Sequence, residues 1–382
     1  MEAAQAERRG APARLPLATV GREWLRIGVL GFGGPPVHIA MLRRRLVEER
    51  HWLEVEEFEA AIAACNLLPG PASTQLAIYC AYRLAGRRGA LVGGLAFIVP
   101  AVVIVTALSV VFLAHTSPRW VRGAGDGAGA AVAPVACAAA LALLAPSWKR
   151  AVAAGGDRRA RWAVYALLGV VSGALLGPYL VLVLVGCGLA ELAMERRAAG
   201  GLRLSAHPLP ALLWVAFKVG ALSYGGGFVI IPLMQDDAVH VYHWMTSGQF
   251  LNAVALGQVS PGPVVATVAA VGYAAHGVLG SAVASVVAFA PSFVFVLIGG
   301  SRFQRLRQWP AAGAFLDGAG PAAIGAIMGA AIPLALALRH GWQYGVLAAA
   351  AVALLGARRG VVPTLLAAGL VGVVVALTGG AV

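Results

Sequence analysis

Charged side chains inside the apolar segments of this chain come in matched pairs. Arg26 has a counterpart in Lys218, 192 residues later, and Asp126 matches Asp317 at an offset of 191. A cation inside an apolar segment is energetically costly and is usually kept for a function. If both cations point inward, they suit a small, multiply charged oxyanion. The two carboxylates are then candidates for coupling that anion to protons.

Both pairs also have simpler structural interpretations. Arg26 and Lys218 could extend to the membrane interface, as long basic side chains do near helix ends. Asp126 and Asp317 each precede Gly-Ala-Gly and could cap the start of a helix, where aspartate is favoured. The sequence leaves both interpretations open.

Matched glycine and proline motifs accompany these charges. Gly33-Gly34 recurs as Gly225-Gly226, and Pro69-Gly70-Pro71 recurs as Pro261-Gly262-Pro263, at one offset of 192 residues. In lipid, a helix is interrupted only where protein or a wet cavity satisfies the freed backbone groups. The helix that resumes after a break presents free N–H groups to an anion. The motifs therefore predict four helix starts near the middle of the membrane, with kinks that serve only packing as the alternative.

The predicted anion site combines the two cations, the glycines of the breaks and the polar side chains next to Pro-Gly-Pro. Its members are Arg26, Gly33, Gly34, Asn66, Gly70, Ser73, Thr74, Lys218, Gly225, Gly226, Gln258 and Gly262. Hydroxyl and amide groups donate hydrogen bonds to oxyanions without any covalent change. Asp126 and Asp317 are the predicted proton-coupling residues.

The elements that must position these residues lie in lipid. Hydrophobic residues make up 60% of the 382 residues and charged residues only 12%, and the mean hydropathy is +0.81. That is more apolar surface than a soluble core could hide. The net charge of +13 does not indicate nucleic-acid binding, because Lys and Arg cluster in short links between apolar runs.

No motif for enzymatic or metal chemistry is found. The chain has no Walker loop and no HExxH sequence, so we expect neither an enzyme nor an ATP-driven pump, and no cofactor. Four cysteines lie in apolar stretches with no CxxC and are interpreted as buried thiols rather than metal ligands: Cys65, Cys80, Cys137 and Cys187. The histidines mostly fall near segment ends and are expected at the interface: His38, His51, His115, His207, His240, His243, His276 and His340.

The apolar pattern predicts an all-α polytopic membrane protein. Apolar segments occupy residues 15–42, 55–84, 89–114, 124–146, 162–177, 178–195, 208–234, 247–275, 278–299, 315–338, 342–356 and 361–378. The chain then divides into a polar arm, a first transmembrane repeat, a basic linker and a second repeat: residues 1–14, 15–195, 196–207 and 208–382. We expect no removable signal peptide, because the arm lacks an apolar stretch before a cleavage site.

Loop charges predict that the two repeats are inverted. The link 83–88 carries three arginines, whereas its counterpart 275–280 carries no charge. The link 43–50 is rich in arginine, whereas 235–242 contains two aspartates. With five crossings in each half, about ten in all, the basic links fall on the cytoplasmic side. The basic N-terminal arm does not fit this scheme, so the side of the termini stays open.

Duplication with broken helices at matching depths is typical of secondary transporters. The motifs that carry it are Phe32-Gly33-Gly34-Pro35, Trp52-Leu53, Phe58 and Pro69-Gly70-Pro71, repeated as Tyr224-Gly225-Gly226-Gly227, Trp244, Phe250 and Pro261-Gly262-Pro263. In this respect the chain, from residue 17 to 378, resembles the chromate ion transporter family in its long, two-domain form. One departure is Gly31, where serine is common in the family.

The resemblance implies a multi-pass protein of the bacterial inner (plasma) membrane. It would export chromate from the cytoplasm as an antiporter, driven by the membrane potential or the proton gradient, and so confer chromate resistance. The partners would be chromate or the similar dianion sulfate and the lipid bilayer, with no nucleic acid, and a homodimer is a further option. The alternatives are a passive anion channel and a membrane scaffold or sensor subunit that transports nothing.

Overall fold

The computed structural model describes residues 15–67, 70–113, 117–176, 180–195, 217, 220, 230–299 and 310–382. All regular secondary structure within these ranges is helical, which confirms the predicted all-α class. The predicted N-terminal arm and basic linker lie outside the described residues, so the division into repeats stays a prediction.

The described helices divide between the two halves of the chain. The first half contains α2 (Leu17–Leu30), α3 (Pro35–Arg43), η1 (Arg44–Glu49), α4 (Val55–Leu67), α5 (Ala72–Phe112), α6 (Arg119–Ala130), α7 (Val132–Ala154), α8 (Arg158–Leu175) and α9 (Leu180–Glu195). The second contains α11 (Ile230–Gln235), η3 (Asp236–Val241), α12 (Ser247–Val259), η4 (Val264–Ala266), α13 (Thr267–Gly299), α15 (Pro310–Leu336), α16 (Gly341–Ala351), η5 (Val352–Gly356) and α17 (Val361–Leu377).

The chain reverses direction within both α5 and α13. Ala85-Gly86 leaves helical dihedrals in α5, and His276-Gly277 does so in α13. Both glycines have positive φ, 68° and 58°, which side chains disfavour. A β-carbon on Gly89 would lie 2.5 Å from the Ala81 carbonyl oxygen, although residues eight apart in a straight helix are separated by about 12 Å. α5 is therefore a helical hairpin, and contacts across the bend in α13 are equivalent.

These reversals fall between apolar segments that the sequence already separated. The predicted segments 55–84 and 89–114 meet at the bend of α5, and 247–275 and 278–299 meet at that of α13. The short predicted helices also occur, as α8 with α9 and as α16 with α17. A glycine that needs positive φ thus marks the hairpin in both halves.

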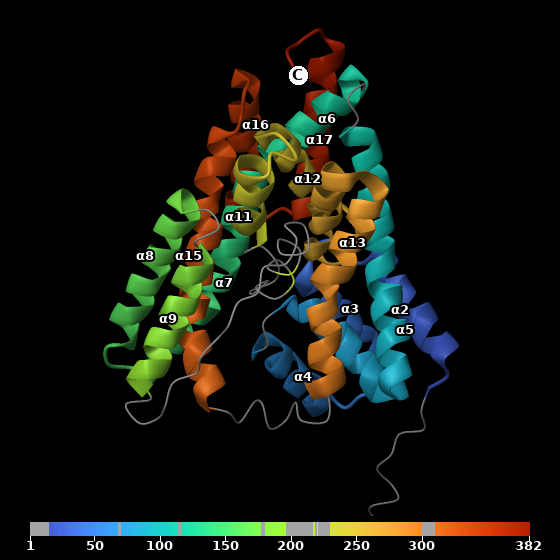
Figure 1. Cartoon of the computed structure of the whole chain (residues 1–382), viewed down its shortest axis with the longest axis vertical. Helices are drawn as coiled ribbons and strands as arrows, with labels where there is room; N and C mark the ends of the chain where they lie inside the picture. Colours follow the sequence, from blue (N-terminus) through green and yellow to red (C-terminus); the bar gives the residue numbers. More distant parts are fainter. Residues whose placement is uncertain are drawn as a thin grey trace, which may run out of the picture.

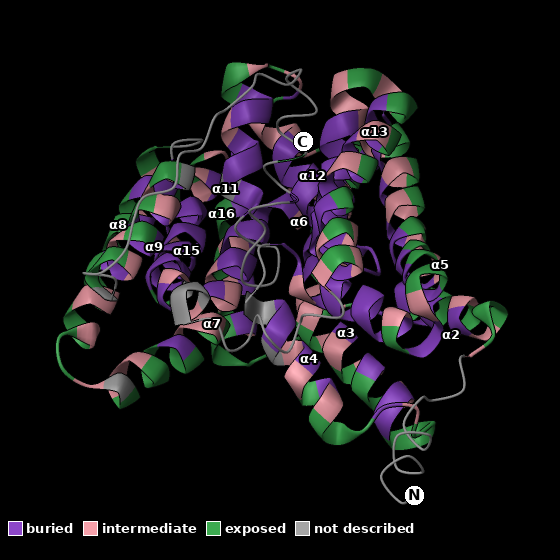
Figure 2. Ribbon diagram, turned by 60° about the horizontal axis from the view of Figure 1, so that its bottom comes forward, coloured by how far each residue is buried: buried purple, intermediate pink, exposed green. Residues whose placement is uncertain are grey.

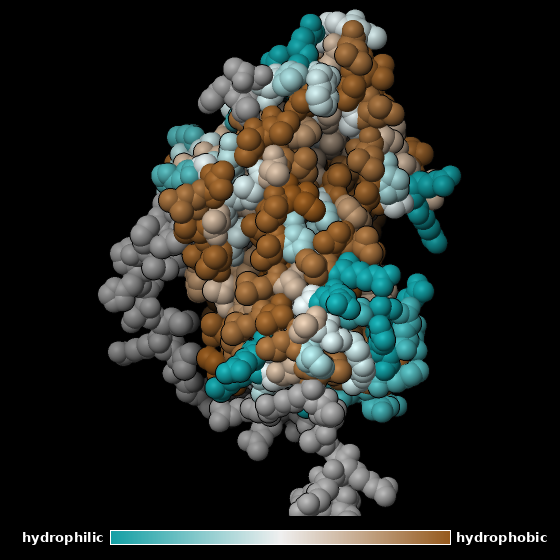
Figure 3. Space-filling model, turned by 90° about the vertical axis from the view of Figure 1, so that its right-hand side faces the viewer, coloured by the Kyte–Doolittle hydropathy of each residue, from teal (hydrophilic) through white to brown (hydrophobic). Residues whose placement is uncertain are grey.

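Four helices among the described residues are long and apolar enough to cross a membrane: Ala72–Phe112, Arg119–Ala153, Val264–Gly299 and Gly313–Leu336. The second arm of the α5 hairpin, residues 87–112, would measure about 39 Å at the usual helical rise, more than the roughly 30 Å of a hydrocarbon core. Figure 3 shows hydrophobic side chains over most of one face, with hydrophilic ones gathered near its lower end. This surface is that of a multi-pass membrane protein.

Equivalent elements lie toward opposite ends of the molecule. In Figure 1, α4 is near the bottom, whereas its counterpart α12 is near the top. The pair α8 and α9 is at the lower left, whereas α16 and α17 are at the top. The core between them is built from both halves, and buried residues gather there in Figure 2.

Glycines allow helices of different halves to pack closely. Gly169 and Gly173 of α8 lie directly on the backbone of α15 at Ala322 and Ala326. α6 packs on α17 in the same manner, through glycines four residues apart. Small residues at this spacing let helix backbones approach in lipid. The halves are thus interlocked.

Candidate functional site

The central glycine of each Pro-Gly-Pro break lies against the backbone of the other half. The Gly262 N–H donates a hydrogen bond to the Gly31 carbonyl oxygen at 3.1 Å, and a β-carbon on Gly262 would lie 3.8 Å from the Gly28 carbonyl oxygen. A β-carbon on Gly70 would lie 3.4 Å from the Gly220 carbonyl oxygen. Gly28 and Gly220 are 192 residues apart, so the two breaks meet the opposite halves at equivalent positions.

Gly33 and Gly34 separate α2 from α3. Their φ angles are 112° and 76°, a conformation that only glycine adopts at little cost. α3 then starts at Pro35, whose ring suits the first helical position. A β-carbon on Gly34 would lie 3.7 Å from the Val264 side chain. The start of α3 therefore lies beside the residues that follow Pro-Gly-Pro in the second half.

Several predicted site residues cannot be placed. Lys218, Gly225 and Gly226 lie outside the described residues, as does the side chain of Asn66. Their roles in the site stay predictions.

The polar residues next to Pro-Gly-Pro are buried. Ser73 and Thr74 follow the first break, and Gln258 precedes the second; all three have little or no exposed surface. The Thr74 hydroxyl and the Gln258 Nε2 have no hydrogen-bond partner among the described residues. A buried donor without a partner is costly. These two groups are therefore the best described candidates for donors to an anion.

His38 corrects the expectation that the histidines lie at the interface. Its side chain is fully buried, and its Nε2 lies 2.8 Å from the Gly31 carbonyl oxygen, the same oxygen that accepts from Gly262. Its ring meets Phe97 edge-on at 5.1 Å between centroids. A β-carbon at position 31 would lie 2.6 Å from the His38 ring. The glycine at that position therefore makes room for the imidazole.

Arg26 has no described contact with the breaks. It is exposed and lines a cavity of about 190 Å³ between α2 and the α3–η1 segment. Arg26 makes no ion pair with the described residues. Its cationic head is therefore available to a ligand in that cavity.

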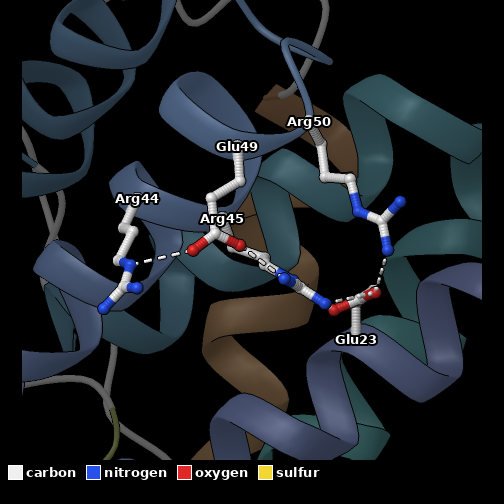
Figure 4. Close-up of polar contacts among 5 residues, drawn as sticks. All are labelled: Glu23, Arg44, Arg45, Glu49 and Arg50. Atoms are coloured by element: carbon white, nitrogen blue, oxygen red, sulfur yellow. Dashed lines mark hydrogen bonds and ion pairs between the residues drawn. The ribbon is translucent and has the colours of Figure 1, made fainter.

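An ion-pair cluster surrounds the same cavity (Figure 4). Glu23 of α2 accepts hydrogen bonds from Arg45 at 2.7 and 3.1 Å and from Arg50 at 3.3 Å. Arg45 also binds Glu49, which accepts a further hydrogen bond from Arg44 at 2.8 Å. Glu23 was not predicted from the sequence. One signal in the sequence could have indicated it. Glu23 is an acid in the same apolar segment as Arg26, and the position equivalent to Glu23 in the second half, position 215, is not acidic.

The two predicted coupling residues lie inside helices and cap none. Asp126 is in the interior of α6, which begins after Pro118, and Asp317 is in the interior of α15. The capping interpretation is therefore wrong, because Arg119 of α6 and Pro310 of α15 each precede the aspartate by seven helical residues, about two turns. Asp126 is half-buried, and its backbone carbonyl accepts from Gln343 at 3.3 Å. Asp317 forms an ion pair with Arg158 at 3.1 Å.

The cysteines behave as expected of buried thiols. Cys65, Cys80 and Cys187 are buried, Cys137 is half-buried, and none forms a disulfide. Within the described ranges, no group of His, Cys, Asp and Glu is arranged to hold a metal ion.

Interlocked halves, hairpin helices and paired glycine breaks define the class as a polytopic membrane transporter rather than an enzyme. The chromate transporter family matches residues 18–192 and again residues 210–373. The chain therefore belongs to the chromate transporter family, in its long form with two copies of the family domain. The two matches begin 192 residues apart, which confirms the offset of the duplication.

The chain is similar to several known proteins over most of its own length and most of theirs. The chain is 33% identical over 332 residues to the chromate transport protein of Cupriavidus metallidurans, covering 82% of this chain and 81% of the relative. It is 31% identical over 342 residues to the chromate transport protein of Pseudomonas aeruginosa, covering 82% and 79%. An uncharacterized transporter of Methanocaldococcus jannaschii is 26% identical over 337 residues. No solved structure matches the chain.

Proposed function

We propose that the protein is a secondary transporter that exports chromate from the cytoplasm and thereby confers chromate resistance. Its family membership over both halves and its likeness to chromate transport proteins support the substrate. The observation that carries the mechanism is the hydrogen bond from Gly262 to Gly31. It joins the break of one half to the helix end of the other.

The anion would be held where these breaks meet. Chromate is a tetrahedral dianion that accepts hydrogen bonds on every oxygen. The Thr74 hydroxyl, the Gln258 amide and the backbone N–H groups of Gly33 and Gly34 would donate to it. The first turn of α3 supplies no donor, because its first two residues are prolines and the N–H groups of Val37 and His38 bond to the Gly34 carbonyl oxygen. Lys218 would add positive charge, and Gly225-Gly226 would supply the matching helix start of the second half. Sulfate has nearly the same shape and charge, so it is the expected competitor.

Alternating access would come from inverted repeats that rock about this shared region. Inversion is supported by the positions of α4 and α12 toward opposite ends (Figure 1). It is supported also by the charges of equivalent links, basic at 43–50 and acidic at 236–237. By the positive-inside rule the basic side faces the cytoplasm, and the membrane would be the bacterial plasma membrane.

Proton coupling would make the protein an antiporter. Asp126 and Asp317 are the proposed carriers, because they recur at equivalent positions and sit in helices that pack against the opposite half. Asp126 accepts a hydrogen bond on its backbone carbonyl from Gln343, near the start of α16 in the other half. Asp317 accepts one on its carboxylate from Arg158, at the start of α8 in the other half. Loading of one carboxylate and release from the other would then occur at different faces.

The test is uptake of labelled chromate into everted membrane vesicles with an imposed proton gradient. We expect uptake that rises with the gradient and falls when unlabelled sulfate competes. Uptake that ignores the gradient would indicate a passive channel. Uptake of neither anion, with the protein present in the membrane, would indicate a scaffold or sensor subunit.

A further inference from the structure

We propose that the cavity beside Arg26 is a vestibule that captures the oxyanion before it reaches the breaks. This inference rests on the proposed transport function and assigns that function a second, outer site. The cavity lies between α2 and the α3–η1 segment, and most of its lining is charged: Glu23, Arg26, Ile27, Leu30, Met41, Arg44, Arg45 and Glu49.

The net charge of the cluster matches a dianion. Four arginines belong to it, because Arg50 binds the same carboxylate as Arg45. Only two carboxylates, Glu23 and Glu49, oppose them. The excess of two positive charges is the complement of chromate or sulfate, and guanidinium groups bind oxyanions through paired hydrogen bonds.

The two carboxylates differ in how easily an anion could replace them. The Glu23 side chain is 7% exposed, whereas that of Glu49 is 34% exposed. Glu49 binds both Arg44 and Arg45, and its pKa is held below the ordinary value by the hydrogen bond from Arg45. It is thus a charged, solvent-side group at the position that an oxyanion would take. Glu23 keeps Arg45 in place during the exchange.

The cavity lies close to the breaks along α2. Arg26 and Leu30 both line it, and the next residue, Gly31, accepts the hydrogen bond from Gly262. Gly31 follows Arg26 by five positions, about 7.5 Å along a helix axis. An anion released by the arginines would therefore have a short path to the region where the halves meet.

The charges of η1 that line this cavity are not repeated in the sequence of η3. At the positions equivalent to Arg44-Arg45 the second half has Asp236-Asp237, and Glu49 is replaced by Val241. η3, which carries these residues, has the same π-helical form as η1. The acidic segment repels an anion where the basic one attracts it. If the halves are inverted, capture is strong on the cytoplasmic face and weak on the outer face.

The experiment measures the KM and maximal rate of chromate uptake in everted vesicles, which present the cytoplasmic face to the medium. Arg26→Gln and Arg44→Gln should each raise the KM about tenfold, the usual loss for one charge-assisted hydrogen bond, and leave the maximal rate within about twofold. Glu49→Gln should lower the KM, because the competing carboxylate is gone. The matched control is Arg22→Gln, on the same helix but not lining the cavity.

The outcomes separate this proposal from the proposed function. Absence of transport by the wild-type protein would contradict the function itself. If the wild type transports chromate but Arg26→Gln and Arg44→Gln have the same KM as Arg22→Gln, the vestibule is contradicted and the transport function is not. A raised KM in Glu49→Gln would overturn it too, because a structural role of the cluster predicts that sign. Thermal melting of each purified variant checks that it is folded.

Discussion

The segments η1 and η3 have the same backbone and opposite charges. Both are π-helical, at residues 44–49 and 236–241. Each is followed by a histidine with positive φ, His51 at 50° and His243 at 51°. Yet η1 begins with two arginines and η3 with two aspartates. Duplication has preserved the conformation of the chain, while the side chains have diverged with the environment of each copy.

The two hairpin helices, α5 and α13, also share a backbone conformation and differ in charge. The bends of α5 and α13 have nearly the same dihedral angles. Three arginines surround the first bend, whereas the second has only His276. Backbone geometry therefore reports the internal symmetry, and the difference in charge is what the proposed inversion of the two copies would produce.

The largest effect is expected from substitution of the central glycine of either Pro-Gly-Pro break. Gly262→Ala and Gly70→Ala should each abolish chromate uptake, because both glycines have positive φ and lie against neighbouring atoms. The strained conformation alone costs about 1–3 kcal/mol. Thermal unfolding and vesicle uptake measure the effect. Gly248→Ala, with open space around it, is the control and should behave as wild type; a large difference between the two test variants would mean that the breaks are not equivalent.

The paired aspartates give the next effect. Asp126→Asn or Asp317→Asn should remove gradient-driven chromate uptake and leave exchange of anion for anion, because the amide keeps the shape but carries no titrating proton. Since neither residue caps a helix, little loss of stability is expected. The measurement is flux with and without a pH gradient. Normal gradient-driven flux in both variants would exclude these residues as proton carriers.

Glu23 forms a contact whose carboxylate has no counterpart in the sequence of the second half, where position 215 is valine. Glu23→Gln should lower the free energy of unfolding by about 1–3 kcal/mol, because Arg45 and Arg50 lose a buried partner. The Arg45 side chain is 23% exposed, which keeps the loss below that of a fully buried pair. Thermal melting in detergent measures it. Glu59→Gln, in an exposed pair with Arg43 at 3.9 Å, is the control, and an equal loss there would contradict a special role for Glu23.

The smallest effect is expected at the outer surface of η1. Arg43 pairs with Glu48 at 3.5 Å, and the two side chains are 47% and 58% exposed. Arg43→Gln should change stability by less than about 0.5 kcal/mol, as is usual for exposed ion pairs. It should also leave the KM for chromate unchanged, because Arg43 does not line the cavity. A tenfold rise in the KM for chromate would show that an arginine outside the cavity matters as much as those that line it, which would contradict anion binding in the cavity.

Much of the fold could be predicted because its signals are local. The bends at Gly86 and Gly277 lie between apolar segments, and the breaks at Gly33-Gly34 and the two Pro-Gly-Pro motifs need residues with special backbone freedom. Such signals repeat at a fixed offset and need no knowledge of distant contacts. The duplication and the family could therefore be inferred from the sequence.

The cluster around Glu23 could not be predicted, because it depends on contacts between α2 and η1 that no local pattern encodes. His38 was misplaced for the same reason: its neighbour Phe97 is far along the chain. The sequence could not decide whether the aspartates cap helices, because glycine-rich helix starts look like loops. α6 runs from Arg119 through Gly123 and Gly125, where tight packing on α17 stabilises residues of poor helix propensity.

The central claim is that equivalent links of unequal charge face opposite sides of the membrane. The most direct measurement is labelling of single cysteines at two exposed, equivalent positions, Arg88→Cys and Leu279→Cys, with a reagent that cannot cross the membrane. The mostly buried native cysteines provide the background, measured without an introduced thiol. Position 88 should react only in everted vesicles and position 279 only in intact cells. Reaction of both positions from the same side would contradict inverted repeats.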